Sequence, residues 1–243
     1  MKFVRGNYIL FRSGTNAELK LKLHKLFLWV PDNIIAVSKN ARDDFFNNGF
    51  PCEVYYPAFC YESSIRDREV SEEKFLFYAG KISENKGVIE LVKFCATNNL
   101  SLKLAGFPDK NDIGYFNKFL EIVDTSIYIS YLGTLSELEV VNFIRKSCGY
   151  ISNSKIEGFP IVFLYCLQFG IPIYTRRFYG FPEDLEMDFI KVFEDIFELS
   201  GVDFCSLNNE SNSTIIQDYY NVKYSNDYKF NLFLTLCQKY YLS

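Results

Sequence analysis

The sequence NSKIEGFPIVFLYCLQFGIP, residues 153–172, has the pattern of a strand end, a tight turn and a short helix. Pro160 suits the first position of that helix, where its missing N–H would be unpaired in any case. Gly170 suits the residue just after the helix, and Pro172 prevents the helix from continuing. The side chains between Pro160 and Gly170 are nearly all apolar, so we expect the helix to be buried on most of its sides.

Glu157 lies just before the N-terminus of this predicted helix. A carboxylate beside the exposed backbone N–H groups of a helix N-terminus marks a place that can hold hydroxyls or phosphate oxygens. The alternative is a structural role, in which Glu157 caps the helix and adds about 0.5–2 kcal/mol of stability. One side chain can fill both roles.

Strand-like and helix-like segments alternate through most of the chain. Short apolar runs predict strands at residues 7–11, 32–38, 53–56, 75–80, 102–105, 127–132, 150–153 and 171–175. Helices are predicted at residues 17–29, 39–48, 88–96, 116–123, 136–146, 213–221 and 228–241, and a strand with a helix at 189–197. Ser136 and Glu139 have the spacing of a capping box. This alternation predicts an α/β fold with a Rossmann-like, doubly wound parallel sheet and ligands at the carboxyl ends of its strands.

Composition indicates a globular protein and argues against several classes of function. Of the 243 residues, 49% are hydrophobic and 23% charged, which allows a sizeable core. The formal net charge of −4 argues against general nucleic-acid binding. The single histidine, His24, argues against a Ser-His-Asp triad and against a histidine-bound metal, and we expect no metal site.

A second group of polar residues follows the strand predicted at residues 75–80. Gly80 and Lys81 lie at its end, and Lys86 and Gly87 precede the next helix, so both lysines can reach a ligand at the edge of the sheet. The spacing is not that of a Walker A loop. A solvated basic turn is the structural alternative.

Together, the two groups resemble the motifs of glycosyltransferase family 4, the retaining nucleotide-sugar glycosyltransferases with the GT-B fold. The residues that match are Lys81, Lys86, Gly87, Ser154, Glu157, Gly158, Phe159, Gly170 and Pro172. Tyr165 departs from the family pattern, which has a second glutamate there, eight positions after Glu157, to bind the ribose hydroxyls. A phenol cannot accept two hydrogen bonds from a cis-diol as a carboxylate can.

The resemblance implies a role for each matched residue. Lys81 and Lys86 would clasp the diphosphate of a UDP- or GDP-sugar donor in place of a metal, and Glu157 would bind the hydroxyls of the donor sugar. No cofactor is expected beyond the donor substrate. The donor-binding residues implied by the resemblance are Gly80, Gly106, Gly133, Thr134, Leu135, Ser154, Gly158, Phe159 and Tyr165.

The resemblance also implies a division of the chain. Residues 1–59 correspond to a shortened N-terminal GT-B portion that lacks the family's glycine-rich loop, and Arg12 lies near the place of a sugar-contacting histidine. Residues 60–73 form a linker. Residues 74–243 form the nucleotide-sugar-binding domain, with the helix predicted at 228–241 crossing back onto the N-terminal portion.

Two functions remain open at this point. The first is an active retaining glycosyltransferase of glycan or polysaccharide biosynthesis, with a glycan, lipid-linked or protein acceptor. The second is an inactive glycosyltransferase-like binding subunit that docks on a partner chain or on a second copy of itself. The seven cysteines show no C-x-x-C spacing and no signal peptide precedes them, so we expect a cytoplasmic protein, soluble or peripheral to a membrane.

Overall fold

The computed structural model describes residues 9–12, 33–36, 39–47, 52–54, 69, 71–178, 181–182, 185 and 187–225. The helices predicted at 17–29 and 228–241 lie outside these residues. Most of the predicted linker at 60–73 also lies outside them, so the division of the chain into domains stays a prediction. Within the described ranges, no helix combines the length and the apolar character needed to cross a membrane.

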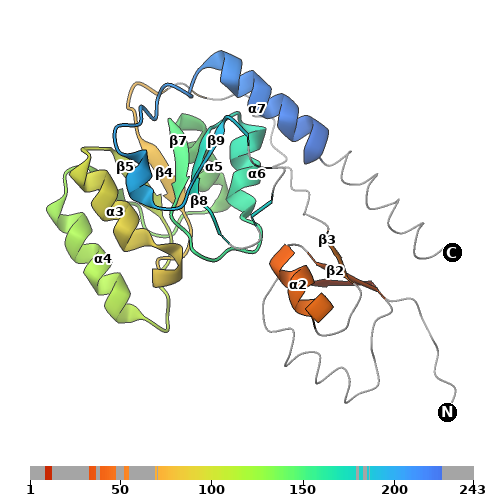
Figure 1. The fold of residues 1–243 in the computed structure, drawn as a ribbon. Coiled ribbons are helices and arrows are strands. Elements are labelled where there is room, and N and C mark those ends of the chain that lie inside the picture. Colours follow the sequence, from red (N-terminus) through yellow and green to blue (C-terminus); the bar gives the residue numbers. More distant parts are fainter. Residues whose placement is uncertain are drawn as a thin grey trace, which may run out of the picture.

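A six-stranded parallel sheet forms the centre of the larger described part (Figure 1). Its strands, in spatial order, are β6 (Ile129–Tyr131), β5 (Leu102–Ala105), β4 (Leu76–Ala79), β7 (Gly149–Ser152), β8 (Ile173–Arg176) and β9 (Ile190–Phe193). The chain runs outward from β4 to β6 and then returns to β4's other side at β7. This is the strand order of a doubly wound sheet, and its topological switch point lies between β4 and β7.

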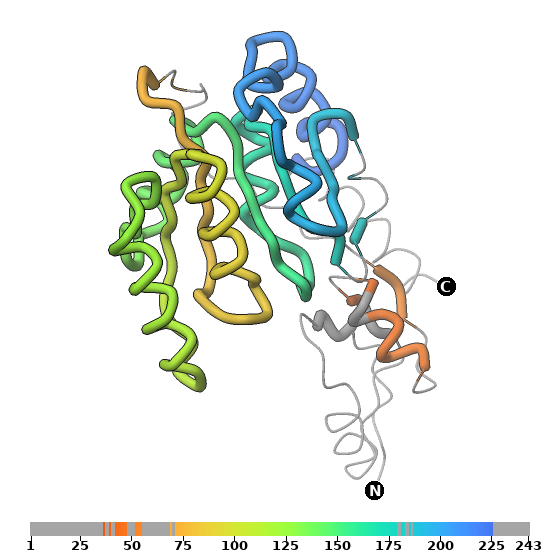
Figure 2. Tube along the Cα trace, turned by 60° about the vertical axis from the view of Figure 1, so that its left-hand side comes forward, coloured from red at the N-terminus to blue at the C-terminus, as the bar shows by residue number. Residues whose placement is uncertain are grey.

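Helices cover both faces of this sheet. The helices α3 (Val88–Thr97) and α4 (Ile113–Thr125) lie side by side on one face, as Figure 2 shows, and the short helix η3 (Ile196–Leu199) packs on α3. The other face carries α5 (Glu137–Lys146), α6 (Ile161–Gln168) and α7 (Glu210–Lys223). The core accordingly has two parts, one on each face. The predicted α/β, doubly wound fold is confirmed.

The helix α6 is buried as the sequence predicts. The side chains of residues 163–167 are all buried. Gly170 follows the helix with a φ of 68°, in the left-handed region that favours glycine. The predicted start is wrong by one residue: Pro160 precedes the helix with an extended ψ of 106°, and α6 begins at Ile161.

A second sheet is formed by the N-terminal residues. It contains the parallel strands β1 (Ile9–Arg12), β2 (Asn33–Ala36) and β3 (Cys52–Val54), with α2 (Lys39–Asn47) between β2 and β3. Phe45 of α2 and Ala36 of β2 are buried. These elements agree with the strands and the helix predicted here, and their bounds differ from the predicted ones by at most two residues.

Candidate functional site

Two loops meet at the switch point of the six-stranded sheet. The loop after β4 contains Gly80, Lys81 and a short helix, η1 (Glu84–Lys86), and the loop after β7 begins at Asn153. The Asn153 side-chain amide donates to the carbonyl of Gly87 at 3.2 Å, and the Lys155 N–H donates to the carbonyl of Asn85 at 2.9 Å. The two predicted groups of polar residues therefore form one structure.

Gly87 is the residue that lets these loops approach closely. Its φ is 59°, and a Cβ there would lie 2.5 Å from the carbonyl oxygen of Asn153 and 2.6 Å from its side-chain nitrogen. Both the backbone conformation and the space exclude a larger residue. The lysine that precedes Gly87 is consequently held at the loop after β7.

Lys86 and Glu157 form an ion pair at this junction, with 2.5 Å between Nζ and Oε1. The two side chains are only 24% and 17% exposed, so the pair is partly desolvated and its attraction is less screened by water than that of a surface pair. The residue before α6, Pro160, makes no side-chain cap hydrogen bond. The Glu157 carboxylate binds Lys86, and its capping role stays a prediction.

Lys81 forms a separate ion pair with Asp109, at 2.7 Å between Nζ and Oδ2. Asp109 lies in the loop after β5, and its N–H donates to the carbonyl of Ile82 at 3.1 Å. Its hydrogen bonds from Lys81 and from the N–H of Asn111 lower the pKa of its carboxyl group. Asp109 was not predicted as a site residue. Its position after the neighbouring strand β5 was the available signal.

Two buried tyrosines hold the Gly80–Lys81 turn in place through hydrogen bonds to backbone carbonyls. The hydroxyl of Tyr78 donates to the carbonyl of Lys81 at 3.0 Å, and that of Tyr150 donates to the carbonyl of Ala79 at 3.2 Å. Their rings stack with centroids 6.4 Å apart. Burial raises the pKa of both phenols, so both stay protonated donors at neutral pH. Neither was predicted as part of the site.

A cavity of about 440 Å³ opens beside this turn, at the carboxyl ends of β4 and β5. Its volume lies in the range of small-molecule sites. Five predicted donor-binding residues line it, namely Gly80, Gly106, Thr134, Leu135 and Tyr165. The other described lining residues are Ala79, Ala105, Phe107, Glu137, Val140, Ile161 and Val162. Most of the wall is therefore apolar.

Tyr165 reaches this cavity from α6 and contacts a carboxylate on the neighbouring helix. Its hydroxyl donates to Oε1 of Glu137 at 2.6 Å, a length typical of a hydrogen bond to a charged acceptor. Glu137 is the first residue of α5, directly after Ser136, whose capping box with Glu139 is confirmed. From the sequence, Tyr165 was interpreted as the loss of a carboxylate, and Glu137 was not predicted as a site residue.

The remaining predicted donor-binding residues are not among the described residues that line the cavity. The carbonyl of Gly133 accepts from the N–H of Gly106 at 2.8 Å, which ties the loops after β5 and β6 together. Ser154 is buried and donates to the carbonyl of Ile156 at 3.1 Å. Gly158 is exposed beside Glu157.

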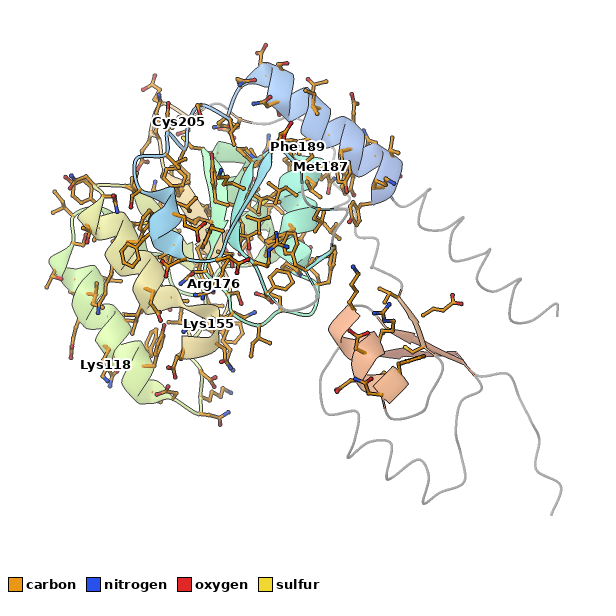
Figure 3. All side chains as sticks on the ribbon, in the orientation of Figure 1. Lys118, Lys155, Arg176, Met187, Phe189 and Cys205 are labelled. Atoms are coloured by element: carbon orange, nitrogen blue, oxygen red, sulfur yellow. The ribbon has the colours of Figure 1, made fainter. Side chains whose placement is uncertain are left out.

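Phe159 packs away from the cavity. Its ring lies against Tyr224 at the end of α7, with centroids 6.0 Å apart. This packing leaves the Phe159 backbone, rather than its side chain, as the part that can serve a ligand held by Glu157. Figure 3 shows two further cationic residues, Lys155 and Arg176, at the carboxyl ends of β7 and β8 on the same edge of the sheet.

A match to a known family accompanies this geometry. The family "Glycosyl transferases group 1" matches residues 62–195, which is more than half of the chain. The chain belongs to this family. The matched residues include both lysine–carboxylate pairs and the cavity between β4, β5 and α6. A search of the curated proteins finds no match.

Solved structures of glycosyltransferases with the GT-B fold share the architecture. TarM is 12% identical and aligns with a TM-score of 0.70 over 94% of this chain, which spans only 49% of TarM. Anabaena HepE, solved with UDP and glucose, is 13% identical, with a TM-score of 0.73 over 94% of this chain and 70% of its own. Pneumococcal GtfA, an O-GlcNAc transferase solved with UDP and GlcNAc, is 13% identical, with a TM-score of 0.62 over 95% of this chain and 52% of its own. At these identities, the likeness establishes the GT-B-like fold.

Proposed function

We propose that this chain is a retaining glycosyltransferase of family 4 that transfers a sugar from a nucleotide diphosphate sugar to an acceptor hydroxyl. The observation that carries the proposal is the partly buried Lys86–Glu157 pair at the switch point, on the loop whose Gly80 lines a ligand-sized cavity. The switch point is where open α/β sheets bind nucleotides. A purely structural turn has no need of such a pair beside a cavity of that size.

The lysines supply positive charge where the reaction creates negative charge. When the bond between the sugar and the phosphate breaks, its electron pair goes to the leaving phosphate oxygen. Fixed cations beside that oxygen stabilise the transition state, an effect worth several kcal/mol. Lys81 and Lys86 take this role without a metal in the proposed mechanism, and Glu157 with the amides of Gly158 and Phe159 holds the hydroxyls of the donor sugar.

The acceptor reacts on the face of the sugar from which the phosphate departs. Its hydroxyl oxygen forms the new bond to the anomeric carbon, and its proton passes to the leaving phosphate oxygen. The anomeric configuration is retained, and no protein base is required. The products are the glycosylated acceptor and the nucleoside diphosphate.

Both lysines are already paired with carboxylates, so the donor must compete for them. Lys86 binds Glu157 and Lys81 binds Asp109, and these four formal charges sum to zero. A diphosphate would replace carboxylate oxygens with phosphate oxygens on each lysine. The same neutrality favours the second candidate function, an inactive glycosyltransferase-like subunit that needs a partner chain or a second copy.

UDP is the first nucleotide to test, because HepE and GtfA were both solved with it. GDP remains the second candidate. We propose a glycan, lipid-linked or protein acceptor in glycan biosynthesis. We also propose a cytoplasmic location, free or peripheral to a membrane, because the cysteines in the described part of the chain are free thiols.

Calorimetric titration of the full chain with UDP, GDP and their sugar conjugates tests donor binding. We expect one nucleotide family to bind and Lys86→Ala to lose that binding. The control is Lys118→Ala, which removes the same charge from the exposed surface of α4, away from the site (Figure 3). Equal affinity of Lys86→Ala and Lys118→Ala would refute the diphosphate role of Lys86.

Turnover separates the enzyme from the binding subunit. With water as acceptor, a retaining enzyme slowly releases a sugar whose first-formed anomer matches the donor, which nuclear magnetic resonance detects before mutarotation. Binding without release of sugar or nucleotide, even with added acceptor glycans, would favour the binding subunit. A released anomer of inverted configuration would refute retention.

A further inference from the structure

We infer that Glu137, held in place by Tyr165, is the group that binds the ribose hydroxyls of the nucleotide. The inference rests on the proposed function and assigns the ribose subsite within it. The two residues come from neighbouring helices, α5 and α6, and line the same cavity. Their side chains are joined by the 2.6 Å hydrogen bond from the Tyr165 hydroxyl to Oε1 of Glu137.

The cavity has one charge among its described lining residues, and that charge is Glu137. A carboxylate repels phosphate, so the diphosphate does not lie against it. It accepts hydrogen bonds from hydroxyls, and a cis-diol can donate to it twice. The lysines that attract phosphate follow Gly80, which lines the cavity from β4. This arrangement orients a nucleotide with its phosphates toward Lys81 and Lys86 and its ribose toward Glu137.

Tyr165 prepares the carboxylate for this contact. The tyrosine is 7% exposed on the buried helix α6, so its hydroxyl has a fixed position. Its hydrogen bond occupies one acceptor site of Oε1 and restricts the rotation of an otherwise exposed glutamate. A carboxylate has about four acceptor sites, so those needed by two hydroxyls remain. Ordering the side chain before binding lowers the entropy lost when the ligand binds.

The start of α5 is fixed as well. Ser136 and Glu139 form a complete capping box, in which Ser136 accepts from the Glu139 N–H and Glu139 accepts from the Ser136 N–H. Glu137 lies between them in the first helical turn, where a negative charge is also favoured by the helix dipole. Tyr165 thus contributes to the ribose subsite indirectly. It positions the carboxylate of Glu137 on the facing helix α5, and that carboxylate contacts the ribose.

The test compares affinities of the full chain for ribose and 2′-deoxyribose forms of the same nucleoside diphosphate, UDP against dUDP or GDP against dGDP. Wild type should prefer the ribose form by about 10- to 100-fold, the range for a hydrogen bond to a charged group. Glu137→Gln should reduce this preference to a few-fold, mainly by weakening the ribose form. Glu121→Gln is the control, since it makes the same change on the exposed surface of α4.

Tyr165→Phe tests the positioning role, because it keeps the ring and removes only the hydroxyl. It should weaken the ribose form by several-fold and leave the affinity for the deoxyribose form unchanged. Equal weakening of both forms would show that Tyr165 only supports the cavity wall, and would overturn its positioning role.

The outcomes separate this inference from the proposed function. If the nucleotide binds but Glu137→Gln keeps the full ribose preference, or if wild type has no preference, the ribose assignment is wrong and the donor site stands. If wild type binds neither form of either nucleotide, both the donor site and the ribose assignment are overturned.

Discussion

Replacing Gly106 with alanine should destabilise the edge of the sheet that carries the cavity. A Cβ on Gly106 would overlap the carbonyl oxygen of Gly80, and would lie 3.0 Å from the carbonyl carbon of Gly80 and 3.2 Å from Cδ1 of Ile82. The nearest obstacle is backbone, which cannot rotate away as a side chain can. The ends of β4 and β5 must therefore separate. This separation stretches the hydrogen bond that the Gly80 N–H donates to the carbonyl of Ala105 at 3.0 Å.

Two costs add to the expected loss of stability. Overpacking of a well-packed site costs about 1–3 kcal/mol. Stretching the Gly80–Ala105 hydrogen bond adds about 0.5–1.5 kcal/mol, the net value of one such bond. We expect Gly106→Ala to lower the free energy of unfolding by about 2–4 kcal/mol.

Urea unfolding followed by far-ultraviolet circular dichroism measures this change through its midpoint and slope. Gly158→Ala is the matched control, because nothing lies within 4 Å of its added Cβ, and it should stay within about 0.5 kcal/mol of wild type. Gly133→Ala measures the cost of a positive φ without steric crowding. Its φ is 72° with open space around it, so it should lose about 1–2 kcal/mol.

The expected order of destabilisation is therefore Gly106→Ala, then Gly133→Ala, then Gly158→Ala. A Gly106→Ala protein as stable as the Gly158→Ala protein would refute the close approach of β4 and β5 at the cavity. If the Gly106→Ala protein is as stable as the Gly133→Ala protein or more stable, the crowding at Gly106 costs no more than the backbone strain at Gly133.

Three further predictions concern the core, the thiols and pH. Leu164→Ala should lower the free energy of unfolding by about 2–5 kcal/mol in the urea assay, because Leu164 is fully buried in α6. The sulfur atoms of Cys148 and Cys205 are 3.1 Å apart, so diamide should oxidise the pair to a disulfide that mass spectrometry detects and Cys205→Ser prevents. The disulfide would close the chain between Cys148 and Cys205 into a loop and should add up to about 4 kcal/mol to the free energy of unfolding. The lowered pKa of Asp109 means that its ion pair with Lys81 contributes stability above the ordinary carboxyl pKa. This contribution disappears as pH falls through the lowered value, so the urea midpoint of Asp109→Asn should fall less on acidification than that of wild type.

The succession of strands and helices along residues 75–176 was predictable from the sequence because each element carries its own local signal. The apolar run at Leu102–Ala105 is a strand with the predicted bounds, and the capping box at Ser136 starts α5 as its spacing indicates. The error at Pro160 has a physical reason. Proline suits both the first helical residue and the residue before it, and only the extended ψ of 106° distinguishes the two positions.

The partners of the site residues were not predictable in the same way. Periodicity shows which face of a helix is apolar, but not which distant polar side chain meets it. The Tyr165–Glu137 contact joins residues 28 apart, and the Tyr150 hydroxyl binds a carbonyl 71 residues away. Lys86 and Glu157 could be assigned to one site only through a family resemblance, and their ion pair was not predicted, because the switch point that joins their loops is a property of the whole sheet.

The site divides into a neutral cluster of four charges and an apolar cavity with one carboxylate, and the division has a consequence for donor recognition under the proposed function. A diphosphate gains contacts with Lys81 and Lys86 only by displacing Asp109 and Glu157, so much of the electrostatic gain offsets the loss of existing ion pairs. The cavity requires no such exchange, because Glu137 keeps its bond to Tyr165 while it accepts a diol. The choice between nucleotides should therefore depend mainly on the base and the ribose, while the lysines hold the diphosphate common to all of them and stabilise the charge that develops in the transition state.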